Sequence, residues 1–128
     1  MTKLRGGFQM SFSEFWPHYL RAHQRPGTRA CHYMASVLGM SSSLAAAVIG
    51  EVLFAVGGIA GAYCLAIGSH WFIEHNKPLI AVNPLYGAMA DVKMCWLAAT
   101  GGLRREFIRV GLEQAMRPAK ALVKPKAV

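Results

Sequence analysis

The stretch GSHWFIEHNKP, residues 68–78, places two histidines and a glutamate directly after a long apolar segment, where buried polar groups are costly. His70 and Glu74 are four residues apart, so they share one face if this stretch is helical. His75 points elsewhere unless the helix unwinds before Pro78. Imidazole and carboxylate groups are together the ligands of iron(II) sites with open positions for substrate and oxygen, and they also suit zinc.

The composition indicates which elements must position these residues. Hydrophobic residues make up 54% of the 128 residues and charged residues only 16%, against about 25% in soluble domains. Glu51 is the only charged residue between Tyr33 and Ser69, and the two uncharged runs beside it are each near the lower length limit for a membrane span. The rest of the chain is too short to enclose two helices that are apolar on all sides. We therefore predict a transmembrane hairpin.

The net charge of +8 comes from basic residues on both flanks of this apolar region. The positive-inside rule then predicts that both termini are cytoplasmic, in a bacterial inner membrane or an organelle membrane. The mixed, charged segment before residue 30 does not match a cleaved signal peptide. No aromatic residues interleave with the basic tail, so we expect anionic lipid headgroups as the partner and not nucleic acid. A homo-oligomer is compatible with the sequence.

Other elements are expected around the hairpin. Ser11 or Ser13 can cap an amphipathic, aromatic-rich helix that lies at the membrane surface and ends at the RPGTR segment, residues 25–29. Residues 79–100 are expected to form a shallow, broken or re-entrant helix pair, and residues 103–116 a basic amphipathic helix. Small residues at four-residue spacing in both spans predict close helix packing; they are Gly39, Ser43 and Ala47, then Gly57 and Gly61, then Gly58, Ala62 and Ala66.

The predicted fold class is thus all-α: a small integral membrane protein with a close-packed transmembrane hairpin and interfacial amphipathic helices. We expect one membrane-embedded domain over residues 1–116 and a basic, disordered tail over residues 117–128.

The hairpin would bring histidines that are distant in the sequence to one membrane face. The first span enters near His32 and the second returns near His70, while His23 lies just before the Pro-Gly pair. With His75, four histidines converge on the cytoplasmic interface. We therefore predict His23, His32, His70 and His75 as metal ligands.

Charged residues close to this face could assist. Asp91 is an acid inside an apolar stretch, which by default is functional or paired. It could orient a ligand histidine or pair with a basic residue. Arg25, Arg29 and Lys77 lie near the predicted site in the sequence and would help to bind a substrate carboxylate.

Three segments resemble a known family: FWPHYLRAHQRPGTRACHYM, GSHWFIEHNKP and NPLYGAMADVKM. They are similar to the membrane dioxygenases of 2-hydroxy fatty acid α-oxidation, which are related to a yeast endoplasmic-reticulum enzyme. The resemblance covers roughly residues 12–110. Its most specific part is the combination of two early histidines with the pattern His-x-x-x-Glu-x-Asn-x-Pro over residues 70–78.

The resemblance implies a site and a reaction. Fe(2+) would be held by the histidines that match the family pattern, His23, His32 and His70. Glu74 and Asp91 match the recurring acids, and Glu74 would be a fourth ligand or a base. Position 69 is serine where the family has glycine, and position 75 is where the family varies. The implied reaction is oxidative removal of one carbon from a 2-hydroxy fatty acid, whose acyl chain would lie between the hairpin and the amphipathic helices.

Two other classes of protein remain open at this point. His32 and His70 lie at similar depth and could hold a haem in an electron carrier, which a Soret band would reveal. A non-catalytic membrane adaptor would instead bind anionic lipid through its basic tail, and it would depend on residues 117–128 and not on the histidines.

Overall fold

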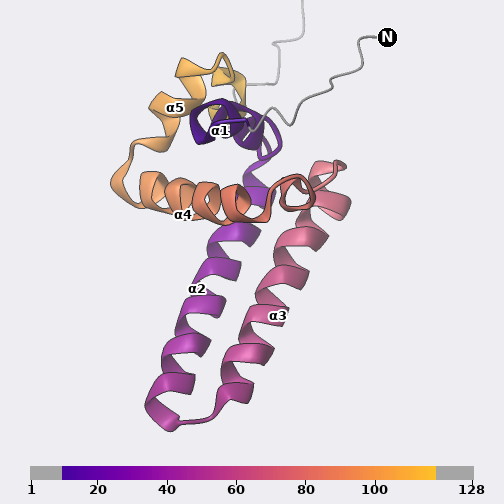
Figure 1. The fold of residues 1–128 in the computed structure, drawn as a ribbon. Helices are drawn as coiled ribbons and strands as arrows, with labels where there is room; N and C mark the ends of the chain where they lie inside the picture. Colours follow the sequence, from indigo (N-terminus) through magenta and orange to yellow (C-terminus); the bar gives the residue numbers. More distant parts are fainter. Residues whose placement is uncertain (1–9, 118–128) are drawn as a thin grey trace, which may run out of the picture.

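The structure is a computed structural model that describes residues 10–117. Within this range the chain forms helices and turns without any strand, so the predicted all-α class is confirmed. Two long helices form a hairpin, and the shorter helices gather at its open end (Figure 1). The predicted disordered tail lies outside the described residues, apart from Arg117.

The hairpin consists of α2 (Pro26–Ile49) and α3 (Val52–Ser69), which run antiparallel and side by side (Figure 1). The turn between them is at Gly50 and Glu51. α2 begins earlier than predicted because Pro26 occupies its first turn, where the missing N–H of proline leaves no hydrogen bond unmade. The Pro-Gly pair therefore starts the hairpin and does not only end the helix before it.

Both hairpin helices are long and apolar enough to cross a membrane, with α3 extended by the turn that follows it. Most of their apolar surface has no protein partner among the described residues. Met40 is 73% exposed, Leu53 73% and Val48 78%. A continuous apolar surface of this kind needs a cover that this part of the chain does not supply.

The two helices approach most closely at one of the predicted small-residue series. A Cβ atom on Gly58 would collide with the Cβ and Oγ atoms of Ser42 on α2, whereas a Cβ atom on Gly57 would meet nothing within 4 Å. The predicted close packing is therefore confirmed, but Gly58 and not Gly57 lies in the contact.

We expect Gly58→Ala to destabilise the hairpin by about 1–3 kcal/mol, because the added methyl group has no space unless the helices move apart. Gly57→Ala is the matched control, and its effect should be at most about 1 kcal/mol, towards greater stability. Thermal unfolding of both variants, followed by circular dichroism in detergent, checks this. Equal melting temperatures for the two variants would contradict the packing described above.

α1 (Phe12–Arg21) begins at Ser11, which accepts a hydrogen bond from the backbone N–H of Glu14, while the Glu14 carboxylate accepts one from the Ser11 backbone. This reciprocal cap confirms one of the two predicted starts. The aromatic face of α1 is buried against α4 and α5 and not spread on a surface. The shared core contains Phe15, Trp16, Leu20, Met94 and Phe107.

α4 (Pro84–Thr100) follows a short 3-10 turn, Leu79–Ala81, and lies across the open end of the hairpin (Figure 1). It is one continuous helix, and it does not run alongside the two long ones. α5 is shorter than predicted and covers only Leu103–Arg109. Gly111 then adopts a φ of 77°, which ends the helix, and a 3-10 turn over Glu113–Met116 follows.

Candidate metal centre

Three buried imidazole rings meet where the hairpin opens. His23 follows the end of α1, His32 lies in the second turn of α2, and His70 begins a π-helical turn, His70–Glu74, after α3. The Nε2 atom of His32 lies 3.3 Å from that of His23 and 3.2 Å from that of His70. Each residue is at most 7% exposed. The predicted convergence of these three histidines is therefore present in the structure.

The opposite nitrogen of each ring has a partner that can only accept a hydrogen bond. The pairs are His23 Nδ1 with the backbone carbonyl of Tyr19 at 2.7 Å, His32 Nδ1 with Oδ1 of Asp91 at 2.8 Å, and His70 Nδ1 with Oδ1 of Asn76 at 2.7 Å. Asn76 donates its own amide N–H to the carbonyl of Ala22, which fixes the orientation of that amide. Each neutral ring therefore has its proton on Nδ1 and a bare Nε2.

Three bare nitrogen atoms facing each other in a buried space repel unless a cation lies between them. Protonation of His23 is not an easy remedy, because burial, together with the nearby His32, lowers the pKa of His23 to about 3. Neutral imidazoles oriented by acceptors behind them are typical metal ligands. The ligand atoms of the three histidines all lie within 4.8 Å of one another, so the group fits one transition-metal ion.

The π-helical turn explains why His70 joins the cluster and His75 does not. The turn widens the helix, and the backbone N–H of Asn76 returns to the carbonyl of His70 at 2.9 Å. His75 is forced into the left-handed region at φ 60°, and its side chain is exposed. π-helical turns often occur at functional sites. The structure does not bring His75, predicted as a fourth histidine ligand, to the other three.

Glu74 also lies away from the cluster, at the start of α2. Its carboxylate accepts hydrogen bonds from the backbone N–H groups of Gln24 and Arg25 at 2.9 and 3.0 Å, and from the Thr28 hydroxyl at 2.6 Å. Negative charge is favourable at a helix N-terminus. The geometry therefore places Glu74 as a cap of α2 and outside the three-histidine group, and a role as ligand or base stays a prediction.

We expect Glu74→Ala to lower the stability of the protein by about 2 kcal/mol, as for loss of a strong helix cap, without removing a metal ligand. Glu51→Ala is a suitable control, because Glu51 precedes α3 without capping it through its side chain. Thermal unfolding and the content of bound transition metal check both variants. If Glu74→Ala folded normally but bound no metal, Glu74 would have to be a ligand.

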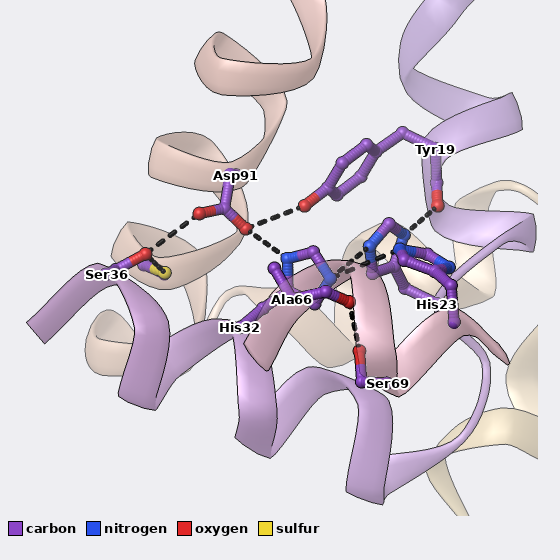
Figure 2. Close-up of polar contacts among 9 residues, drawn as sticks. Tyr19, His23, His32, Ser36, Ala66, Ser69 and Asp91 are labelled. Carbon is purple, nitrogen blue, oxygen red and sulfur yellow. Dashed lines mark hydrogen bonds and ion pairs between the residues drawn. The ribbon is translucent and has the colours of Figure 1, made fainter. Parts of the chain in front are cut away.

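Asp91 holds His32 in place. Figure 2 shows its carboxylate between three donors: His32 Nδ1 and the Tyr19 hydroxyl at 2.9 Å reach Oδ1, and the Ser36 hydroxyl at 2.8 Å reaches Oδ2. Burial alone would raise the pKa of Asp91, but these hydrogen bonds keep it below its ordinary value. Of the two roles predicted for Asp91, the structure has the orienting one. Asp91 does not itself face the Nε2 atoms.

None of the three basic residues predicted to bind a substrate carboxylate lines the cavity that borders the cluster. Arg29 is buried, where it donates hydrogen bonds to the carbonyls of His23 and Gln24 and lies over the Phe107 ring at 5.1 Å. The side chains of Arg25 and Lys77 are exposed. The structure therefore assigns Arg29 to the packing of the chain around His23.

A cavity of about 670 Å³ borders the cluster. The three histidines, Tyr19 and Asp91 form its polar end, and the remaining lining residues, from α2, α3, α4 and the 78–80 segment, are mainly apolar. Its size is that of a pocket for a small organic ligand. Within the part of the chain that the structure describes, no lysine or arginine lines this cavity.

Two partners of the histidines were missing from the sequence-based prediction, the carbonyl of Tyr19 and the amide of Asn76. The first is four residues before His23, in the last turns of α1, a spacing that could have indicated it. The contact of Asn76 with His70 follows from the π-helical turn, and the hydrophobic periodicity of the sequence does not predict such a turn.

Comparison with known proteins gives one match. A model of the family described as 2-hydroxy-palmitic acid dioxygenase Mpo1-like matches residues 9–103, which is more than half of the chain and includes the three histidines and Asp91. No curated protein and no solved structure matches the chain. The match agrees with the resemblance carried by the three sequence segments. The chain belongs to the 2-hydroxy-palmitic acid dioxygenase Mpo1-like family.

Proposed function

We propose that the protein is an iron(II)-dependent dioxygenase that shortens 2-hydroxy fatty acids by one carbon. The observation that supports this most strongly is the convergence of three buried, bare Nε2 atoms at the end of an apolar cavity. His23, His32 and His70 would hold iron(II), which would supply a binding position for such an acid and the means to activate O₂. The family match supports the class of substrate.

The residues of the chain prepare this chemistry in two ways. Asp91, Asn76 and the Tyr19 carbonyl hold the three rings in one tautomer, and the negative charge of Asp91 makes His32 a stronger donor. The burial of the rings keeps bulk water away from the reacting groups. No side chain needs to act as a nucleophile.

The same geometry makes binding of the acid depend on the cation. Among residues 10–117, no lysine or arginine side chain lines the cavity, so none of them meets a carboxylate that enters it. Burying an unpaired carboxylate is costly. The acid should therefore bind tightly only when the three histidines hold a cation.

The overall reaction balances without a further reductant. The C1–C2 bond breaks, C2 becomes the carboxyl carbon of the shortened acid, and C1 leaves as carbon dioxide. A 2-hydroxy fatty acid and O₂ thus give a fatty acid one carbon shorter, carbon dioxide and water.

An oxygen electrode and a 2-hydroxy fatty acid labelled at C1 test this proposal directly. We expect O₂ consumption and release of labelled carbon dioxide in equal amounts, without added reductant. A 3-hydroxy isomer and the unsubstituted acid serve as controls and should give neither. Turnover that requires an added electron donor, or that releases no labelled carbon dioxide, would contradict the proposed reaction.

We propose further that α2 and α3 span a membrane with both termini on the cytoplasmic side. The exposed apolar surface of the hairpin and the basic residues on its two flanks support this arrangement. The protein should remain with the membrane fraction after washing at alkaline pH. Its release into the soluble fraction would contradict the proposal.

A further inference from the structure

The cavity beside the histidines continues along the hairpin as a groove. From His32 its lining residues on α2 extend as far as Ser43, and those on α3 extend as far as Ile59. α4 covers the end near the histidines, where Val92 contributes to the lining. At 1.5 Å per residue, the distance from His32 to Ser43 along α2 is roughly 16 Å.

This length corresponds to one leaflet of a membrane. The hydrocarbon core of a bilayer is about 30 Å thick, so each leaflet contributes about 15 Å. With the histidines at the membrane face, the groove would end near the middle of the bilayer. A fatty acid bound with its head group at the histidines would therefore have its alkyl chain at the same membrane depth as a free fatty acid in the leaflet.

The groove also opens sideways. Met40 and Ile59 line it and are 73% and 43% exposed, on the surface that the proposed membrane would cover. Its floor is made of small residues, and a Cβ on Gly39 would lie 3.6 Å from the Cβ of Ala62 across the hairpin. An apolar groove that is open along its side can admit an alkyl chain from the leaflet without passage through water.

We propose that this groove holds the alkyl chain of the substrate, taken laterally from the leaflet, and that Ser43 and Ile59 at its far end set the longest chain that fits. The identity of the head group rests on the function proposed above. The alkyl chain is the expected occupant because the groove is continuous with the space in front of the three histidines, and none of the described residues that line its far part is charged.

The test is binding of saturated 2-hydroxy fatty acids of increasing length to the iron-loaded protein in lipid nanodiscs. Ser43→Leu places two additional heavy atoms at the far end of the groove. Each methylene that is excluded costs about fourfold in affinity. We therefore expect Ser43→Leu to weaken binding of the longest acids on the order of fifteenfold and to leave the affinity for short acids unchanged.

Ser41→Leu is the matched control. Ser41 is two residues away, donates a similar hydrogen bond within the helix, to the carbonyl of Leu38, and is exposed outside the groove. The Ser41→Leu variant should bind 2-hydroxy fatty acids of every length with the affinity of the wild type. Ile59→Phe narrows the same end from α3, and it should reproduce the length dependence if Ser43→Leu does not fold.

The outcomes separate this inference from the proposed function. If Ser43→Leu and Ile59→Phe, both folded, bind long and short 2-hydroxy acids as the wild type does, the groove is not the site of the chain, while the function stands. Long-chain alcohols lack the carboxylate, so their binding to metal-free protein tests the groove alone. If they bind and lose affinity in Ser43→Leu, the groove is supported even if no 2-hydroxy acid is oxidised. If they do not bind, the inference is overturned.

Discussion

His70→Ala is expected to lose turnover of 2-hydroxy fatty acids by more than a hundredfold, whereas His75→Ala should stay close to the wild type. Replacing only the partner behind a metal ligand typically costs about 10–100-fold, so loss of the ligand itself should exceed that. The two histidines are neighbours in the sequence pattern, but the π-helical turn buries one and exposes the other.

Initial rates of O₂ consumption with a 2-hydroxy fatty acid measure this difference. Circular dichroism of both variants provides the control for folding, because His70 is buried and its loss leaves a small void. Substantial activity in a folded His70→Ala variant, or its loss in His75→Ala, would mean that the cluster is assembled differently.

Asp91→Asn is expected to weaken metal binding by about 10–100-fold while leaving the three ligands in place. Asparagine retains an oxygen that can accept from His32 Nδ1, but it lacks the negative charge that strengthens the donor on the other side of the ring. The Tyr19 hydroxyl also donates a hydrogen bond to the Oδ1 atom of Asp91. Because this oxygen is retained in the variant, the side chain at position 91 should keep its position.

Ser36→Ala is the control for Asp91→Asn. Ser36 donates to Oδ2, the oxygen that does not contact His32, so its loss should change metal affinity only slightly. Titration with iron(II) under anaerobic conditions gives both affinities. Equal effects of the two substitutions would show that Asp91 acts through the general order of the region and not through the His32 ring.

The features that follow a simple period could be predicted from the sequence. The uncharged runs on either side of Glu51 indicated two long helices, and a tight turn between them returns His70 to the level of His32. His23 could be added because the short segment before Pro26 cannot take it far away. The three converging histidines therefore follow from topology alone.

The features that depend on local departures from helical geometry could not be predicted. A regular helix would place Glu74 on the face of His70, but the π-helical turn rotates it towards the N-terminus of α2. The same turn moves His75 outwards and brings Asn76 back to His70. One wide turn thus changes the roles of three residues in a row.

The position of α4 relative to the hairpin could not be predicted from the sequence either. Its length and composition did not distinguish a re-entrant segment from a helix lying across the hairpin. Its placement depends on the core that it shares with α1 and α5, a single buried cluster that includes Met94, Trp16 and Phe107. Contacts between elements so distant in the chain leave no periodic signal.

The structure also bears on the two alternative classes. A haem held between His32 and His70 would need its macrocycle in a space where their Nε2 atoms are only 3.2 Å apart and His23 is adjacent. The adaptor alternative gives no reason for three buried histidines with oriented tautomers. A colourless protein without a Soret band would exclude the haem carrier.

The most direct test of the account is the metal content of the protein, purified in detergent without oxygen and measured by plasma mass spectrometry beside His70→Ala. We predict about one iron per chain in the wild type, as expected for a single three-histidine site, and none in the variant. Stoichiometric zinc, or no metal even after reconstitution with iron(II), would contradict the proposed dioxygenase.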